Sequence, residues 1–290
     1  MPASPRRPGA VRPDDSAIII SDVDGTLFDD GGWAAPPGEL RALMGTRPLV
    51  LASSRTVREL IVLQHTLGMR GPVIAENGAV VAFDAPTDDG LTRPRVIGRR
   101  TVHVRRLGQS TPIVRSLLAE AAREAGVVVL PADRIDPARR ALRGIASHGA
   151  VRRALEAREA SVLLEPLALS ISARLRWHQA LAERGVQLST GGRWACAVSG
   201  ADKGRAARLV RHVLASTMAE PVTTMGLGND ANDAALLAAV DRPIAVRRAD
   251  GRVHPSLLAV DDVVVCQRPG IGGALDALRA QLGATPAGPA

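Results

Sequence analysis

Short apolar runs alternate along this chain with longer stretches of helical periodicity. The first run, Ile18–Ile20, is followed at once by Ser21 and Asp22. A β-branched run of this kind is typical of a strand that is buried on both faces of a parallel sheet. Further runs lie at residues 48–52, 72–75, 222–227, 243–246 and 263–266, and the helices expected between them include 37–44, 205–217, 231–239 and 270–282. The alternation predicts an α/β fold with a parallel sheet flanked by helices.

The pattern changes over a long central segment, where strands mix with helices and no strand ends in acidic residues. We therefore expect a core in two pieces, 16–84 and 199–282, with an α+β cap inserted at 85–198. The Pro- and Arg-rich residues 1–15 are expected to form a disordered leader, and residues 283–290 a frayed tail.

Composition narrows the possible partners. The net charge is +8, but the basic residues are dispersed, aromatic residues make up only 2% of the chain, and tyrosine is absent. Nucleic-acid binding by base stacking is therefore not expected, whereas an acidic small substrate suits the charge. The sequence has no apolar run long enough for a membrane span, and the leader lacks the apolar segment of a secretory signal, so we expect a cytoplasmic protein. Cys196 and Cys266 are expected to be small core residues.

Two carboxylates lie where the first strand ends. Asp22 and Asp24 are one residue apart and are followed by Gly25-Thr26. In open α/β sheets, ligands bind at the carboxyl ends of the strands, and two neighbouring acids repel each other unless a cation or a reaction compensates. An acidic turn that caps a helix is the alternative interpretation, but it does not account for the Gly-Thr that follows.

The single lysine is the second unusual feature. Of 37 basic residues, 36 are arginine and one is Lys203, which opens the helix expected at 205–217 together with Asp202 and Gly204. An ammonium is a compact point charge and a guanidinium is a planar fork, so the two are not interchangeable. A helix N-terminus also favours phosphate. A surface lysine left by chance is the alternative.

The run from Asp22 to Thr26 resembles the first motif of the haloacid dehalogenase (HAD) superfamily of phosphotransferases, Asp-x-Asp-Gly-Thr. The resemblance implies a Rossmann-like parallel sheet with an inserted C2-type cap. It also implies that Asp22 attacks phosphorus, that Asp24 acts as acid and then as base, and that Lys203 neutralises the phosphoryl charge. The expected cofactor is Mg²⁺, with one oxygen from the Asp22 side chain and one from the Val23 backbone.

Ser53 follows the second strand, at the place where the family has a Thr or Ser that binds the phosphoryl group. A serine there also suits a helix N-cap. With Asp22 and Lys203 in register we favour phosphate contact for Ser53 and assign the cap to Ser54, which is also a candidate substrate ligand.

The acidic motif of the family has the form Gly-Asp-x-x-Asn-Asp, and this chain departs from it. Asn229 occupies the position of the first metal-binding aspartate, while Asn232 and Asp233 match. An amide oxygen can bind Mg²⁺ but carries no charge. Either the metal is bound more weakly, or Asp230 turns inward to replace the missing carboxylate; the sequence leaves both open. The candidate metal ligands are therefore Asp22, Asp24, Asn229, Asp230 and Asp233.

Several segments resemble one branch of the superfamily, the mannosyl-3-phosphoglycerate phosphatases: residues 53–56, 76–79, 191–194 and 249–251. The resemblance implies a substrate with a phosphate, a carboxylate and sugar hydroxyls. The candidate substrate ligands are Ser54, Asn77, Gly78, Arg158, Arg193 and Asn232. The two arginines are chosen because a guanidinium binds carboxylate bidentately.

The interpretation is a Mg²⁺-dependent phosphatase of a phosphorylated sugar or glycosyl-phosphoglycerate, with mannosyl-3-phosphoglycerate favoured. Alternatives are glucosyl-3-phosphoglycerate or sucrose phosphate as substrate, a phosphomutase, and a binding protein that has lost turnover. Neither nucleic acid nor membrane is an expected partner, and the sequence leaves the oligomeric state open.

Overall fold

The computed structural model describes residues 17–29, 32–135, 148–165, 167–190, 194–218 and 221–283. The leader and most of the tail predicted from the sequence lie outside these residues. No helix within the described ranges is both long enough and apolar enough to span a bilayer.

A nine-stranded sheet forms the core, in the order β14-β13-β12-β1-β4-β5-β6-β8-β7. The strands from β14 to β5 pair in parallel, and β6, β8 and β7 extend the sheet in antiparallel fashion. Their bounds are β1 Ile18–Asp22, β4 Leu49–Ala52, β5 Val73–Ala75, β6 Val80–Phe83, β7 Arg93–Ile97, β8 Arg100–Arg106, β12 Thr224–Gly228, β13 Arg242–Arg247 and β14 Val264–Pro269. The predicted α/β fold is therefore confirmed.

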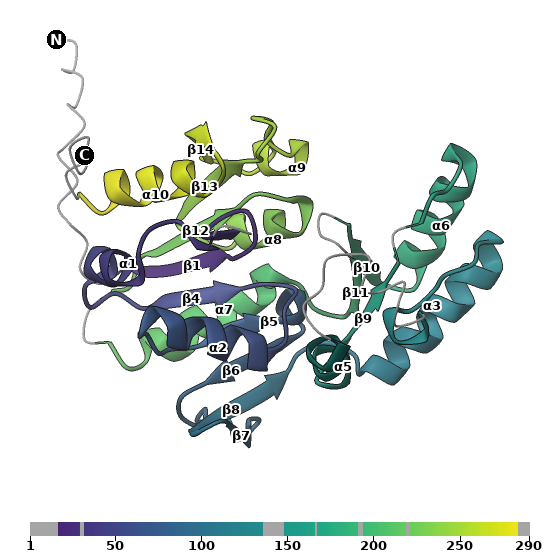
Figure 1. Ribbon diagram of the computed structural model, residues 1–290, viewed down its shortest axis with the longest axis horizontal. Helices are drawn as coiled ribbons and strands as arrows, with labels where there is room; N and C mark the ends of the chain where they lie inside the picture. The colour runs from purple at the N-terminus through teal and green to yellow at the C-terminus, as the bar shows by residue number, and fades with distance from the viewer. Residues whose placement is uncertain are drawn as a thin grey trace, which may run out of the picture.

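Helices cover both faces of this sheet (Figure 1). One face packs against α1 (Pro37–Met44), α2 (Val57–Leu67) and α10 (Gly270–Gln281), and the other against α7 (Lys203–Ala215) and α8 (Ala234–Leu237). Alternate residues of β1 point to opposite faces, so its isoleucines are buried in both layers; this is the reason for the continuous apolar run. Short elements complete the core: η1 Glu76–Gly78, η3 Ala231–Asp233, α9 Pro255–Leu258 and the two-stranded ribbon β2 (Phe28–Asp29) and β3 (Gly32–Trp33).

A smaller α+β unit lies to the right of the core in Figure 1. It contains a three-stranded antiparallel sheet, β10-β11-β9, with its own apolar cluster against α3 and α6. The bounds are α3 Thr111–Ala125, η2 Ala132–Arg134, α5 His148–Glu156, β9 Ser161–Leu164, α6 Ile171–Glu183, β10 Val186–Ser189 and β11 Ala195–Ser199.

The predicted start of the cap at residue 85 needs correction. The strands β7 and β8 fall inside the predicted range 85–198, yet β8 pairs with β6 and extends the core sheet. Val102 and Val104 are buried while their neighbours in β8 are more exposed. This alternation belongs to an outer strand with one covered face, and the sequence analysis took it for part of the insertion.

Candidate active site

Asp22 ends β1 at the carboxyl edge of the sheet and is only 7% exposed. The Lys203 ammonium donates a hydrogen bond to its Oδ1 at 2.6 Å, and the Thr26 hydroxyl lies 3.3 Å from its Oδ2. Burial, followed by the nearby charge of Asp233, raises the pKa of Asp22 to about 7, although Lys203 acts in the opposite direction. A second positive charge next to Asp22 would therefore favour its ionised form.

Lys203 is buried at the first turn of α7, which Asp202 caps by accepting a hydrogen bond from the Arg205 N–H at 2.8 Å. Its Nζ lies 2.6 Å from Asp22 and 2.6 Å from Asp233. Burial alone would lower the pKa of Lys203, but the two carboxylates raise it above its usual value, so the side chain remains an ammonium. The single lysine of the chain thus lies between two buried acids.

Asp24 is half-exposed and is held by Arg55. The guanidinium donates from Nε to Oδ2 at 3.0 Å and from Nη2 to Oδ1 at 2.5 Å, and it also lies 5.6 Å from the centroid of the Phe28 ring. The hydrogen bond to Asp24 raises the pKa of Arg55 despite its burial. Arg55 was not among the predicted site residues. The one feature of the sequence that could have indicated it is its position two residues after Ser53.

Ser53 is buried directly after β4, and its hydroxyl lies 3.4 Å from Asp24 Oδ2. The cap of α2 comes from Thr56, whose side chain and Glu59 form a reciprocal capping box. The assignment of this cap to Ser54 is therefore wrong, because Thr56 already satisfies the free N–H groups. This leaves the Ser53 hydroxyl for the site.

The oxygen atoms near Asp22 differ from those predicted for the metal. The Val23 carbonyl accepts hydrogen bonds from the N–H groups of the following turn, at 2.9–3.2 Å, and is used there. The Asp24 carbonyl instead faces Asn229, whose amide nitrogen donates to it at 3.1 Å. Gly25, with φ +77°, brings this turn so close to Asn229 that a Cβ at residue 25 would lie 2.4 Å from the amide nitrogen. The Val23 carbonyl thus accepts from three backbone N–H groups, whereas the hydrogen bond to the Asp24 carbonyl comes from a side chain that a metal ion could displace.

The remaining predicted metal ligands are engaged elsewhere. Asp230 caps η3 and forms an ion pair with Arg248 at 2.6 Å. Asp233 accepts from Lys203 and from the N–H groups of Asn229 and Asp230. Within the described ranges, no group of three His, Cys, Asp or Glu side chains is placed to hold a metal ion. The Asp22 carboxylate and the Asp24 carbonyl are hard oxygen donors that fit Mg²⁺, and Asn229 would add a third if its amide group turned to present the oxygen in place of the nitrogen.

Asn77 links three parts of the molecule. It donates to Ser189 of the cap at 2.9 Å and accepts from Asn232 at 3.1 Å. Its φ is +54°, and the next residue, Gly78, approaches α7 so closely that a Cβ there would lie 2.1 Å from the Asp202 carbonyl oxygen. The structure thus brings the predicted ligands Asn77, Gly78 and Asn232 together.

Of the two arginines predicted to bind the substrate carboxylate, Arg158 is among the described residues and Arg193 is not. Arg158 lies between the core and the cap, where its Nη1 donates to the Ser54 carbonyl at 3.1 Å and to Ser161 Oγ at 2.8 Å. Its Nε is buried without a hydrogen-bond partner among the described residues. Arg193 lies outside the described residues.

A cavity of about 560 Å³ opens beside Lys203, between β10 of the cap and the loops that follow β12 and β13. Its lining includes the predicted residues Asn77, Lys203, Asp230 and Asn232; the other residues that line it are Gln187, Leu188, Ser189, Thr190, Cys196, Val198, Asp202, Ala231, Arg248 and His254. Arg248 and His254 were not predicted to lie at the site. In a sequence with 36 arginines, nothing in the local pattern distinguishes Arg248 from the others.

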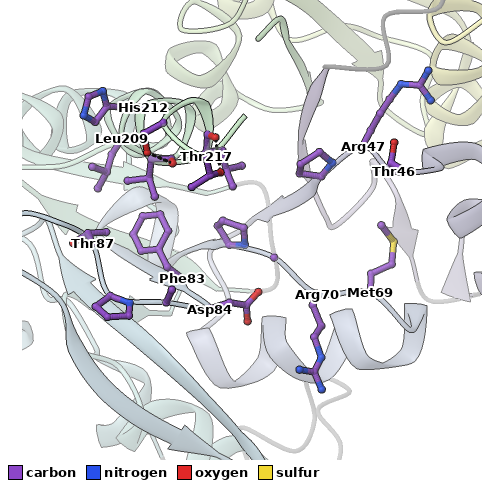
Figure 2. A pocket seen from close by; sticks show the side chains of 18 of the residues that line it. Thr46, Arg47, Met69, Arg70, Phe83, Asp84, Thr87, Leu209, His212 and Thr217 are labelled. Carbon is purple, nitrogen blue, oxygen red and sulfur yellow. Dashed lines mark hydrogen bonds between the residues drawn. The ribbon is translucent and has the colours of Figure 1, made fainter. Parts of the chain in front are cut away.

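A second cavity, of about 620 Å³, lies at the opposite, amino edge of the parallel strands, where Pro48 and Pro72 precede β4 and β5. Figure 2 shows its apolar wall with Phe83 and Leu209, and in this view the side chains of Arg47 and Arg70 point in different directions. This cavity contains none of the side chains described around Asp22. The candidate active site is therefore the carboxyl edge.

Comparison with known proteins agrees with this architecture. Residues 19–98 match the haloacid dehalogenase-like hydrolase family. A crystal structure from Thermoplasma acidophilum is 17% identical with a TM-score of 0.61, and the match covers 92% of this chain and 97% of that one. A phosphatase of the HAD superfamily from Bacteroides thetaiotaomicron is 16% identical with a TM-score of 0.61, over 96% and 99%. The sucrose-phosphatase from Synechocystis, solved with sucrose and phosphate, is 19% identical with a TM-score of 0.58, over 92% and 98%.

At these identities the solved structures show a shared fold, that of the capped HAD proteins. The match of residues 19–98 relates this part of the chain to the haloacid dehalogenase-like hydrolases.

Proposed function

We propose that this protein hydrolyses a phosphomonoester with Mg²⁺ through an aspartyl-phosphate on Asp22, and that its substrate is mannosyl-3-phosphoglycerate, which yields mannosylglycerate and phosphate. The observation that carries the proposal is the placement of Asp22: a buried carboxylate at a strand end, 2.6 Å from the only lysine and two residues before Asp24. A carboxylate so placed is a suitable nucleophile.

In the first half-reaction an oxygen of Asp22 attacks phosphorus and the bond to the leaving oxygen breaks. Asp24 donates a proton to that oxygen. In the second half-reaction Asp24 takes a proton from water, the water oxygen attacks phosphorus, and the acyl-phosphate bond breaks to restore Asp22. Arg55 orients Asp24 through two hydrogen bonds to its carboxylate.

Lys203 and the Ser53 hydroxyl hold the phosphoryl oxygens. Lys203 remains protonated throughout, because two carboxylates stabilise its charge. The Asp22 side chain, the Asp24 carbonyl and Asn229 would hold Mg²⁺, which supplies further charge compensation when bound. Phosphoryl transfer depends mainly on such positioning and charge compensation.

Two considerations support the substrate, and a third favours its nearest alternative. The sequence resembles mannosyl-3-phosphoglycerate phosphatases over several segments. The cavity beside Lys203 carries neutral hydrogen-bonding side chains of the kind that bind sugar hydroxyls, Gln187, Ser189 and Thr190 among them. The structural similarity to a sucrose-phosphatase favours the nearest alternative, another sugar phosphate.

The test is turnover of p-nitrophenyl phosphate with Mg²⁺, followed by a panel of sugar phosphates and glycosyl-phosphoglycerates. We expect turnover that Asp22→Asn abolishes, and the highest kcat/KM on mannosyl-3-phosphoglycerate. Full activity of Asp22→Asn would exclude the covalent route. A preference for a sugar phosphate without carboxylate would replace the proposed substrate and leave the chemistry intact.

A further inference from the structure

Arg248 is a cation of the cavity beside Lys203 that the proposed chemistry does not use. It lies in the loop after β13, and its side chain is 39% exposed. Lys203, by contrast, is enclosed by Asp22 and Asp233. Arg248 is thus the guanidinium that lines this cavity within the described part of the chain.

Among the described residues, the Arg248 side chain has one hydrogen-bond partner, Asp230. Its Nη2 donates to Asp230 Oδ1 at 2.6 Å, and Asp230 is itself fixed as the cap of η3. The guanidinium has five N–H donors in one plane, so an arginine bound to one carboxylate can still bind another with its remaining donors. Asp230 therefore positions the side chain without using up its binding capacity.

His254 lies in the same wall of the cavity. Its Nδ1 accepts a hydrogen bond from the Ser256 N–H at 3.2 Å and caps α9. This contact leaves Nε2 as the ring nitrogen that can interact with a ligand. The opposite wall, on β10, offers the neutral polar side chains of Gln187 and Ser189. The core wall of the cavity therefore carries charged side chains of both signs, Lys203 and Arg248 with Asp202 and Asp230, whereas the cap wall is neutral and polar.

Arg158, the arginine chosen from the sequence for a carboxylate, lines no part of this cavity. It is engaged with Ser54 and Ser161 between core and cap.

We propose that Arg248, oriented by Asp230, binds a carboxylate on the leaving group, and that the substrate class is therefore a phosphate ester of a hydroxy acid. The proposal rests on the proposed function and specifies which part of the substrate Arg248 binds: the phosphate is bound at Asp22 and Lys203, the carboxylate at Arg248, and any hydroxyl-bearing remainder against β10.

The test compares kcat/KM on a substrate that carries a carboxylate with kcat/KM on the corresponding uncharged methyl ester. 3-Phosphoglycerate and its methyl ester differ in that charge and in one methyl group, and mannosyl-3-phosphoglycerate and its methyl ester give a second pair. For the unmodified protein, kcat/KM is expected to be higher on the acid than on the ester. In Arg248→Gln the acid-to-ester ratio should fall roughly ten- to hundredfold, the effect of losing a hydrogen-bonded ion pair. Arg248→Lys should give an intermediate ratio, since an ammonium lacks the planar fork.

Arg252→Gln is the matched control: it is an exposed arginine in the same loop that lies outside the cavity lining, and it should leave the ratio unchanged. Equal losses on acid and ester in both Arg248 variants would overturn the proposal, as would an unmodified protein that does not distinguish the two. Absence of turnover on every phosphomonoester, p-nitrophenyl phosphate included, would instead overturn the proposed function. The ratio is measured within each variant, so a loss of folded protein does not alter it.

Discussion

Glu76 of the core accepts a hydrogen bond from Ser161 of the cap, with 2.5 Å between Oε2 and the hydroxyl oxygen. The same carboxylate accepts from the N–H groups of Glu159 and Ala160 at 3.0 Å each. Glu76 is 1% exposed and has φ +51°, a conformation that a non-glycine residue adopts at a cost. A buried carboxylate is tolerated here because the cap supplies its donors. The first strand of the cap is therefore anchored to the loop that precedes Asn77.

Glu76→Gln should weaken this anchor. The substitution replaces one acceptor oxygen by an NH₂ group that faces a donor, so a buried N–H or hydroxyl loses its partner at a cost of about 1–3 kcal/mol. We expect a lower free energy of unfolding, faster amide hydrogen exchange at residues 159–161, and a lower kcat/KM on p-nitrophenyl phosphate. Glu159→Gln, which removes a partly exposed ion pair with Arg95, is the control. Unchanged exchange at 159–161 in Glu76→Gln would contradict the anchoring role.

The parts of the site that could be predicted from the sequence are those that depend on the pattern of apolar and polar residues within one strand or helix. Asp22 follows an uninterrupted apolar strand, and Lys203, the only lysine, opens an amphipathic helix. The end of a strand and the start of the helix that follows a strand both lie at the carboxyl edge of a parallel sheet, so the two residues were expected at the same edge. The structure brings them within 2.6 Å. The parallel sheet and most of its helices were predicted for the same reason, because their periodicity is local.

The parts that could not be predicted depend on long-range packing. Arg158 and Arg248 look alike in a sequence with 36 arginines, and only the fold directs one to the core–cap contact and the other to the cavity. Glu76 precedes an Asn-Gly pair, so the sequence predicts only a turn at this place. Its hydrogen-bond donors, in residues 159–161, lie more than 80 residues further along the chain. The Val23 carbonyl was predicted as a metal ligand, and the structure shows it accepting hydrogen bonds from the N–H groups of residues 26–28, which the sequence analysis did not anticipate.

Asn229→Asp is expected to tighten Mg²⁺ binding. It would place a second carboxylate beside the Asp24 carbonyl, where the Asn229 amide nitrogen now donates a hydrogen bond. Hard divalent cations favour charged oxygen ligands, so we expect roughly tenfold tighter binding by calorimetry, with no need of turnover.

Asp230→Asn should change the Mg²⁺ affinity little, because that carboxylate caps η3 and pairs with Arg248. If instead Asp230→Asn abolished Mg²⁺ binding and Asn229→Asp had no effect, then Asp230 would be the carboxylate that replaces the family's aspartate.

Lys203→Met should destabilise the protein and inactivate it. The substitution leaves Asp22 and Asp233 buried without their shared cation, and removing one partner of a buried ion pair costs about 3–5 kcal/mol. Urea unfolding measures the loss, and the double variant Lys203→Met with Asp233→Asn should recover part of the stability but none of the activity. A Lys203→Met protein that unfolds at the same urea concentration as the unmodified protein would show that the ion pairs contribute nothing to stability.

Asp22→Asn should stabilise the metal-free protein at alkaline pH. Burial and Asp233 raise the pKa of Asp22 to about 7, against an ordinary value of 3.8. The folded protein therefore holds this proton more tightly than the unfolded chain, so the contribution of Asp22 to stability is complete below about pH 4 and is lost as pH rises through about 7. Asparagine cannot ionise and keeps an oxygen for Lys203.

The free energy of unfolding of Asp22→Asn minus that of the unmodified protein should therefore increase between pH 5 and pH 8, by roughly 2–3 kcal/mol. Denaturant unfolding in EDTA at both pH values measures it. Mg²⁺ should shrink the increase, since the ion binds the ionised carboxylate. A difference that stays constant from pH 5 to pH 8 would mean that Asp22 is already ionised at pH 5, and that Lys203 outweighs both burial and Asp233.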